Sequence, residues 1–292
     1  MTVLPRPSRA IEVSLIAMAV IWGVNFSVVK YGTTVMEPIA YNTLRMGIAT
    51  VILLGIAYGR SARRPSTQER NKLLALGILG HCVYQLLFVG GLAMTRAGTA
   101  SLVVAASPAV VAIVARFFGH DKLPAKAVAG IVLSMSGVML VVSGSISTDG
   151  TGHLIGDLLI LLAVVVWAFY TNGLVPLAQH VEPAQVAAWT LVGGVVPLAV
   201  IATPALIRTE WMAITPLTWA AVLYSGIIAM VIAYLVWYYG VRAIGPTRTA
   251  MFANLQPLVA VLVAWAFLGE VPTIFQGAGA GAVIGGLYLA RR

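Results

Sequence analysis

The chain has 292 residues, of which 60% are hydrophobic and only 9% are charged, and its formal net charge is +9. A soluble domain carries charge on about 25% of its residues, so this composition excludes a soluble protein and predicts an all-α integral membrane protein. The apolar runs are longer than the roughly ten-residue alternating segments of a transmembrane β-barrel. The basic residues flank these runs, which indicates contact with membrane lipids and argues against nucleic acid as a partner.

Apolar runs that approach the roughly 20 residues needed for a membrane-spanning helix recur along the whole chain. Breaks at charged residues and at Gly/Pro clusters predict ten spans, at 11–31, 39–58, 73–94, 97–117, 125–144, 155–175, 183–204, 216–238, 247–267 and 272–290. The connections are short, so no separate soluble domain is expected. The single cysteine, Cys82, excludes an intrachain disulfide.

The distribution of basic residues predicts the orientation of the chain. If the N-terminus is cytoplasmic, most of the 18 Lys and Arg residues lie inside, and only Lys30, Arg45, Arg96 and Arg208 lie outside. Cytoplasmic loops carry such an excess of positive charge, so both termini are predicted to be cytoplasmic. Lys30 and Arg45 fall near outer helix ends, from which we expect them to reach the lipid headgroups.

The two halves of the chain repeat one another at a shift of about 145 residues. Matched pairs in unbroken order are Trp22 with Trp167, Glu37-Pro38 with Glu182-Pro183, Arg96 with Arg242, Pro108 with Pro257, Gly130 with Gly279, and Gly137 with Gly286. The predicted repeats, 1–146 and 147–292, hold five spans each, and an odd number inverts the second copy. Inverted repeats are typical of secondary transporters that bind substrate near the membrane midplane.

Three stretches resemble a known family: VIWGVNF, RAGTASLVVAASP and FLGEVPTIFQGAGAGAVIGGLYLA, which begin at Val20, Arg96 and Phe267. They are similar to EamA-type members of the drug/metabolite transporter superfamily, and the resemblance covers essentially the whole chain. The plan is most similar to that of the bacterial YddG-type exporters of aromatic and other amino acids. This resemblance implies amino-acid export across the bacterial inner membrane by a ten-helix, two-repeat protein.

All nine acidic residues fall at or near predicted span ends, so no carboxylate is expected at mid-membrane. A buried carboxylate is what an antiporter that exchanges protons for lipophilic cations needs. The lack of such a carboxylate argues against this mechanism, and efflux of drugs or other lipophilic compounds is kept as the alternative to amino-acid export. An intramembrane lipid-modifying enzyme is less favoured, because the sequence offers neither paired carboxylates nor a Ser/His pair at membrane depth. A receptor or scaffold would not need the repeat.

Polar and aromatic side chains inside the spans are the candidates for a substrate path. In the third span His81, Tyr84, Gln85 and Phe88 have the spacing of one helix face. The alternative for such a face is a hydrogen-bonded contact between helices. The segment of Trp237 in the eighth span is assigned in part to the aromatic belt at the membrane interface. The expected path residues are Asn25, His81, Tyr84, Gln85, Phe88, Trp167, Tyr170, Asn172, Tyr234, Asn254 and Gln256.

Two further patterns concern motion and packing. Pro108 and Pro257 lie near the middle of spans four and nine, where each removes a backbone hydrogen bond and is a candidate hinge or a static kink. The spacing Gly277-xxx-Gly281-xxx-Gly285 predicts a close-packing helix face instead of a nucleotide loop. No cofactor or metal site is expected, since the remaining histidines lack ligand spacing. A small-molecule substrate is the expected partner, and a monomer is the simplest assembly.

Overall fold

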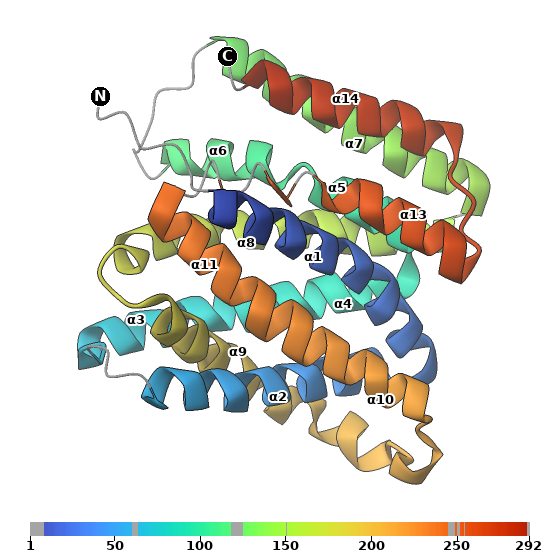
Figure 1. The fold of residues 1–292 in the computed structure, drawn as a ribbon. Coiled ribbons are helices and arrows are strands. Elements are labelled where there is room, and N and C mark those ends of the chain that lie inside the picture. Colours follow the sequence, from blue (N-terminus) through green and yellow to red (C-terminus); the bar gives the residue numbers. More distant parts are fainter. Residues whose placement is uncertain are drawn as a thin grey trace.

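The computed structural model describes residues 9–59, 64–117, 125–149, 151–244, 249, 252–253 and 255–290, and these are helical apart from short connections (Figure 1). In chain order the elements are α1 (Arg9–Val35), α2 (Pro38–Gly59), α3 (Thr67–Gly77), η1 (Ile78–Val83), α4 (Tyr84–Met94), α5 (Ala97–Val104), α6 (Ser107–Phe117), α7 (Ala125–Asp149), α8 (Thr151–Ala178), α9 (Pro183–Arg208), η2 (Trp211–Ala213), α10 (Pro216–Leu223), η3 (Tyr224–Ile232), α11 (Ala233–Ile244), α13 (Gln256–Leu268) and α14 (Ile274–Ala290). The all-helical class predicted from composition is confirmed for the described residues.

Seven helical stretches are long and apolar enough to cross a membrane: Arg9–Val35, Pro38–Gly59, Thr67–Met94, Ala97–Arg116, His153–Ala178, Pro183–Arg208 and Pro216–Ile244. Shorter apolar helices occupy Val128–Gly144, Gln256–Leu268 and Ile274–Gly286. The chain is therefore a multi-pass membrane protein. The first turn of α1 and the last turn of α14 lie at the same end of the molecule, at the left of Figure 1. The count of ten spans and the cytoplasmic placement of that end stay predictions.

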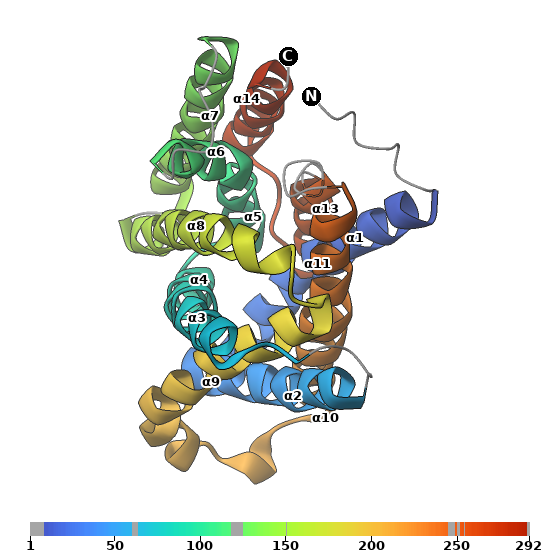
Figure 2. The ribbon, with the colours of Figure 1, turned by 90° about the vertical axis from the view of Figure 1, so that its left-hand side faces the viewer.

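Equivalent helices of the two halves make equivalent contacts. Helix α1 packs on α13, and α8 packs on α5 and α6. The pairs α2 with α9 and α7 with α14 each join one helix from either half. Figures 1 and 2 both show α7 and α14 side by side at the opposite edge from α2 and α9. A two-fold relation between the halves would produce this pairing, while the repeat boundaries at 146 and 147 stay predictions.

The third and the eighth predicted spans both contain a π-helical segment. In the first half η1 lies between α3 and α4, and in the second half η3 lies between α10 and α11. Ile78 and Tyr224, at which these segments begin, are matched by the repeat shift. A π-helix bonds each N–H to the fifth carbonyl before it and is frequent at functional sites. Both wide segments therefore sit at corresponding depths in the bundle.

The fourth predicted span is broken at its centre. Helix α5 ends at Val104 and α6 begins at Ser107, so that Pro108 lies in the first turn of the second piece. Proline is tolerated in a first turn because its missing N–H would have no partner there. In the second half Pro257 likewise lies in the first turn of α13. The break is thus part of the fold, and its role as a hinge stays a prediction.

Charged side chains at the span ends bind backbone groups of neighbouring helices. Glu270 accepts hydrogen bonds from the backbone N–H groups of Ala97 at 3.0 Å and Gly98 at 3.1 Å, at the start of α5. Lys30 donates to the carbonyls of Leu92 at 3.1 Å and Ala93 at 2.9 Å, near the end of α4. The expectation that Lys30 reaches lipid headgroups is therefore wrong. The last carbonyls of a helix form the negative end of its dipole, which favours a nearby cation.

The glycine face that joins α14 to α7 differs from the predicted one. A Cβ atom at Gly277 or Gly281 would meet no other atom within 4 Å, so these glycines do not mediate the contact. At Gly279 a Cβ would lie 2.8 Å from the carbonyl oxygen of Gly137, and at Gly286 a Cβ would lie still closer to the carbonyl oxygen of Gly130. The contact face therefore consists of the glycines that the repeat matches, because only they let the two backbones approach.

Candidate functional site

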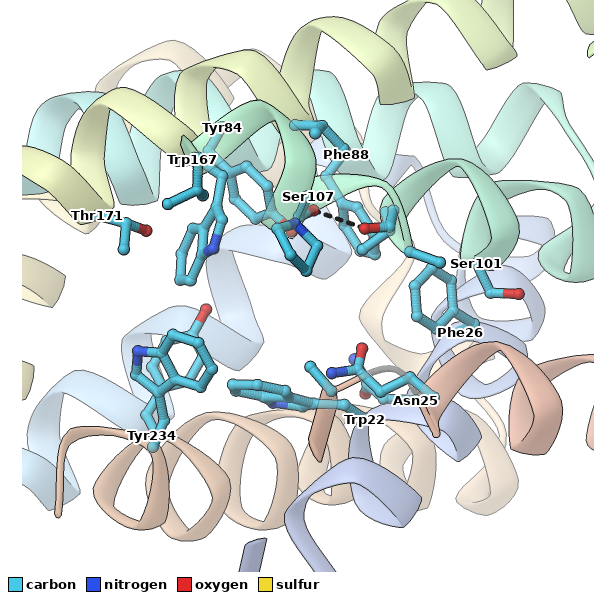
Figure 3. A pocket seen from close by; sticks show the side chains of 18 of the residues that line it. Trp22, Asn25, Phe26, Tyr84, Phe88, Ser101, Ser107, Trp167, Thr171 and Tyr234 are labelled. Atoms are coloured by element: carbon cyan, nitrogen blue, oxygen red, sulfur yellow. Dashed lines mark hydrogen bonds between the residues drawn. The ribbon is translucent and has the colours of Figure 1, made fainter. Parts of the chain in front are cut away.

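A cavity of about 400 Å³ lies between the two halves of the bundle (Figure 3). The first half contributes lining residues from α1, α2, α4, α5 and α6, and the second half from α8, η3, α11 and α13. The residues that line it are Trp22, Asn25, Phe26, Arg45, Tyr84, Gln85, Phe88, Ser101, Val104, Ala105, Ser107, Pro108, Val111, Ala112, Ala115, Val164, Trp167, Thr171, Asn172, Val175, Ala229, Met230, Tyr234, Trp237, Ala253, Gln256 and Pro257. Its size is that of a site for a small organic molecule.

Aromatic rings form much of the cavity wall, and they touch one another. The ring of Trp22 lies 5.7 Å from that of Tyr234 in an edge-on arrangement. On the other side, Tyr84 lies 5.1 Å from Trp167 and 5.6 Å from Phe88, with which it is stacked. Figure 3 shows these rings facing a common open space. Such edge-on and offset pairs stabilise one another beyond their buried area, so the wall is preorganised for an apolar or aromatic ligand.

Polar groups reach this wall at a few positions. The side-chain oxygen of Asn25 is buried without a hydrogen-bond partner in the described part of the chain. The amide of Asn172 donates to the carbonyls of Ala168 at 2.9 Å and Val111 at 3.2 Å. A buried acceptor without a partner costs free energy, and a ligand that donates a hydrogen bond would remove that cost at Asn25.

Comparison with known proteins decides the family. A profile of the EamA-like transporter family matches residues 10–143 and 154–292. The chain belongs to this family.

Named relatives of this EamA-family chain are transporters. It is 30% identical over 287 residues to the uncharacterized transporter YyaM of Bacillus subtilis (strain 168), with 96% of this chain and 93% of that protein covered. It is 26% identical to a probable terminal-alkyne amino-acid exporter of Streptantibioticus cattleyicolor, with 96% and 92% covered. A probable amino-acid metabolite efflux pump of Salmonella typhimurium is also 26% identical, with 93% and 91% covered. A solved crystal structure that is 19% identical shares the fold, with a TM-score of 0.70 and 97% of both chains covered.

Most of the residues predicted for the path line the cavity of this EamA-family chain. They are Asn25, Tyr84, Gln85, Phe88, Trp167, Asn172, Tyr234 and Gln256, together with the two prolines Pro108 and Pro257. Asn254 lies outside the described residues. Their arrangement brings together one face of α4, the middle of α8, and the starts of α6 and α13. Whether substrate passes along them stays a prediction.

Two predicted residues, His81 and Tyr170, lie behind the cavity wall and do not line it. Both are fully buried, and the Tyr170 hydroxyl lies 3.4 Å from His81 Nε2 and 2.5 Å from the hydroxyl of Tyr238. The His81 ring packs 5.5 Å from the ring of Tyr234, which does line the cavity. This network of buried polar groups therefore supports the wall from behind.

The charged residue of the cavity, Arg45, is not among the residues predicted for the path. Arg45 was expected at the lipid headgroups, but only 1% of it is exposed and it lines the cavity. Its Nε donates to Asn42, three residues earlier on the same helix, at 2.9 Å. An amide one turn from an arginine inside an apolar span was the signal that could have identified it. Trp237, assigned in part to the aromatic belt, is also buried and lines the cavity.

The described residues contain no cluster of three or more His, Cys, Asp or Glu side chains that could hold a metal ion. Cys82 is buried and unpaired with another cysteine. Among the described residues that line the cavity, Arg45 is the only charged one, and none is acidic. Chemically the cavity therefore offers aromatic surface, a few amide and hydroxyl groups, and a single positive charge.

Proposed function

We propose that this chain is a secondary transporter that exports amino acids, aromatic and other neutral ones, or related small metabolites from the cytoplasm. The observation that carries the proposal is the aromatic cavity of about 400 Å³ that both halves of the bundle enclose. A site between two halves can be opened to either side of the membrane when the halves rock against each other. We place the protein in the bacterial inner membrane and liken it to the YddG-type exporters.

The relatives support this assignment in its general part. Two of the proteins that are 26% identical carry names that refer to amino-acid or amino-acid-metabolite export. A cavity with large aromatic walls suits the side chains of aromatic and aliphatic amino acids. A non-enzymatic role is in keeping with the transporter family to which the chain belongs.

Efflux of lipophilic cations is the second candidate function, and the residues that line the cavity disfavour it. A cation in a low-dielectric site needs a negative or strongly polar partner. None of the described residues that line the cavity is acidic, and Arg45 would repel a cation. The alternative therefore finds less support than export of neutral or zwitterionic metabolites.

Transport by the purified protein in liposomes tests the proposal. Vesicles loaded with labelled phenylalanine, threonine or methionine should release label several-fold faster than protein-free vesicles. Release at the rate of empty vesicles for all three would overturn the assignment to amino acids. In cells, expression should raise tolerance to a toxic phenylalanine analogue, because export lowers its cytoplasmic concentration. Greater sensitivity would mean uptake instead of export.

A matched pair of tryptophan variants ties the flux to the cavity. Trp167→Leu removes an indole from the cavity wall, whereas Trp265→Leu removes one that is 55% exposed on the outer surface. We expect the first to lower phenylalanine flux several-fold and up to about tenfold, since a contact between aromatic rings contributes ~0.5–1.5 kcal/mol. The second should leave flux unchanged. Equal effects would place the transport path elsewhere.

A further inference from the structure

Arg45 is a buried cation inside a membrane-spanning helix. It lies in α2, and its side chain is among the largest that are fully buried in the described chain. Arginine is almost never fully buried unless it is paired. Ionisable residues inside membrane spans are rare, and most of them mark substrate or ion pathways. A reason for keeping this charge must therefore come from its partners or from a ligand.

Its protein partners are all neutral oxygens. Beyond the bond to Asn42, the Nη1 group donates to the hydroxyl of Ser225 at 2.8 Å, and Nη2 donates to Oε1 of Gln85 at 2.6 Å. These three bonds orient the guanidinium, which has five N–H groups in a rigid plane. The other two N–H groups make no hydrogen bond to any described residue, and no described carboxylate lies within ion-pair distance. The positive charge is held in place but not neutralised.

Arg45 lines the same cavity as the aromatic wall. Arg45 and Gln85 line it, along with Trp22, Tyr84 and Tyr234. A guanidinium with two free N–H groups suits the two oxygens of a carboxylate, to which arginine binds in a bidentate manner. A single positive charge balances a monoanion, whereas a phosphate dianion would leave one negative charge uncompensated in an apolar site. The wall beyond the charge fits an apolar or aromatic body.

We propose that Arg45 binds the carboxylate of the substrate, so that the cavity takes apolar monocarboxylates whether or not they carry an α-amino group. The proposal rests on the proposed function, in which this cavity is the substrate site. None of the described lining residues is acidic, so no protein charge pairs with an ammonium group. Aromatic oxo acids and arylpropionates are thereby substrates in addition to aromatic amino acids, and amines without a carboxylate are excluded.

Binding of matched ligands to the wild-type protein in detergent tests this without any substitution. The ligands are 3-phenylpropionate, its neutral amide, phenylethylamine and phenylalanine. Their binding is measured by the quenching of tryptophan fluorescence, because Trp22, Trp167 and Trp237 line the cavity. We expect 3-phenylpropionate to bind at least about tenfold more tightly than its amide. Phenylalanine should bind no more tightly than the acid, because no charged residue of the described lining pairs with its ammonium group, and phenylethylamine should bind most weakly. Equal binding of acid and amide, or tightest binding of the amine, would overturn the proposal.

Variants then assign the preference to Arg45. In Arg45→Gln the ratio of the affinity for the acid to that for the amide should fall to about one. The variant should still bind the amide, which shows that its site is folded. Arg45→Lys should keep part of the preference for the acid, because lysine keeps the positive charge but lacks the planar guanidinium that binds a carboxylate with two N–H groups. Arg208→Gln is the control, since its side chain is 68% exposed and pairs with Glu37. An unchanged ratio in Arg45→Gln would disprove the role.

The outcomes separate this inference from the proposed function. Preferential binding of the acid without flux in proteoliposomes would refute transport and leave the carboxylate site standing. Phenylalanine flux with no preference for acid over amide would support transport and refute the carboxylate site. In flux measurements, an excess of 3-phenylpropionate should inhibit phenylalanine release, and the amide at the same concentration should not.

Discussion

Arg45 in α2 donates a hydrogen bond of 2.8 Å to Ser225 in η3, and this bond joins the two halves of the bundle across 180 residues of sequence. The bond holds the one charged group of the described cavity lining in place. Ser225 stands in the π-helical segment η3, which packs on α2. If the two halves rock against each other, this hydrogen bond must either break or move with them.

Replacing Ser225 by alanine should destabilise the protein. The change removes an acceptor from a buried guanidinium, and hydrogen bonds to charged groups contribute ~1.5–3 kcal/mol, above the ~0.6 kcal/mol average for neutral pairs between membrane helices. We expect a lower melting temperature in detergent and weaker binding of 3-phenylpropionate. Ser136→Ala is the control, because Ser136 is exposed and bonds only within its own helix, to Val132. Equal melting temperatures of the two variants would show that the contact contributes nothing.

The helical multi-pass class could be predicted because it follows from the local density of apolar residues, which does not depend on folding partners. The face of the third span was predicted in part. Tyr84, Gln85 and Phe88 all lie in the α-helix α4 and line the cavity, as helical spacing requires. His81 lies in the π-helical segment η1, where the wider turn rotates it away from that face. Helical periodicity alone could not reveal this change of register.

The role of Arg45 could not be predicted for a different reason. Its partners Gln85 and Ser225 are far away in sequence, so an arginine in an apolar span was assigned to the lipid surface. The glycine contact shows the same limit. Spacing along α14 suggested Gly277, Gly281 and Gly285, but the face that meets α7 is selected by the partner helix.

Adding a methyl group at Gly279 should weaken the pairing of α14 with α7. A Cβ there would lie 2.8 Å from the carbonyl oxygen of Gly137, and overpacking of this kind costs ~1–3 kcal/mol. Gly281→Ala on the same helix should be neutral or stabilise by up to ~1 kcal/mol, because its Cβ would meet no atom within 4 Å and alanine favours the helix. Thermal unfolding in detergent compares the two. A more stable Gly279→Ala protein would contradict the close contact.

Neutralising Glu270 should loosen the start of α5. Its two carboxylate oxygens accept from Ala97 and Gly98, in the first turn, where a negative charge is favourable. Glu270→Gln loses the charge and one of the two acceptors, so we expect a loss of ~1–2 kcal/mol in unfolding free energy. Glu210→Gln, at an exposed position without a side-chain cap, should show no change. Hydrogen exchange of the Ala97 and Gly98 amides should rise only in the first variant.

Tyr84 and Tyr170 offer a test of which buried tyrosines contact substrate. Tyr84 lines the cavity, whereas Tyr170 lies behind it and bonds to Tyr238. Tyr84→Ala should raise the dissociation constant for phenylalanine by about tenfold or more. Tyr170→Phe keeps the ring and removes the hydrogen bond, so it should lower the melting temperature and leave binding nearly unchanged. A large loss of binding in Tyr170→Phe would move the substrate path behind the present wall.

The break before Pro108 provides a direct test of the hinge. The carbonyl of Val104 would accept from residue 108 in a continuous helix, but proline has no N–H, and Ser107 Oγ donates to that carbonyl at 2.6 Å instead. Pro108→Ala supplies the missing N–H, which should join α5 and α6 into one stiffer helix. We expect phenylalanine flux in proteoliposomes to fall several-fold while the dissociation constant stays within about twofold. Pro204→Ala, which removes a proline from the interior of α9, is the control. Flux equal to wild type in Pro108→Ala would make the break a static feature of the fold.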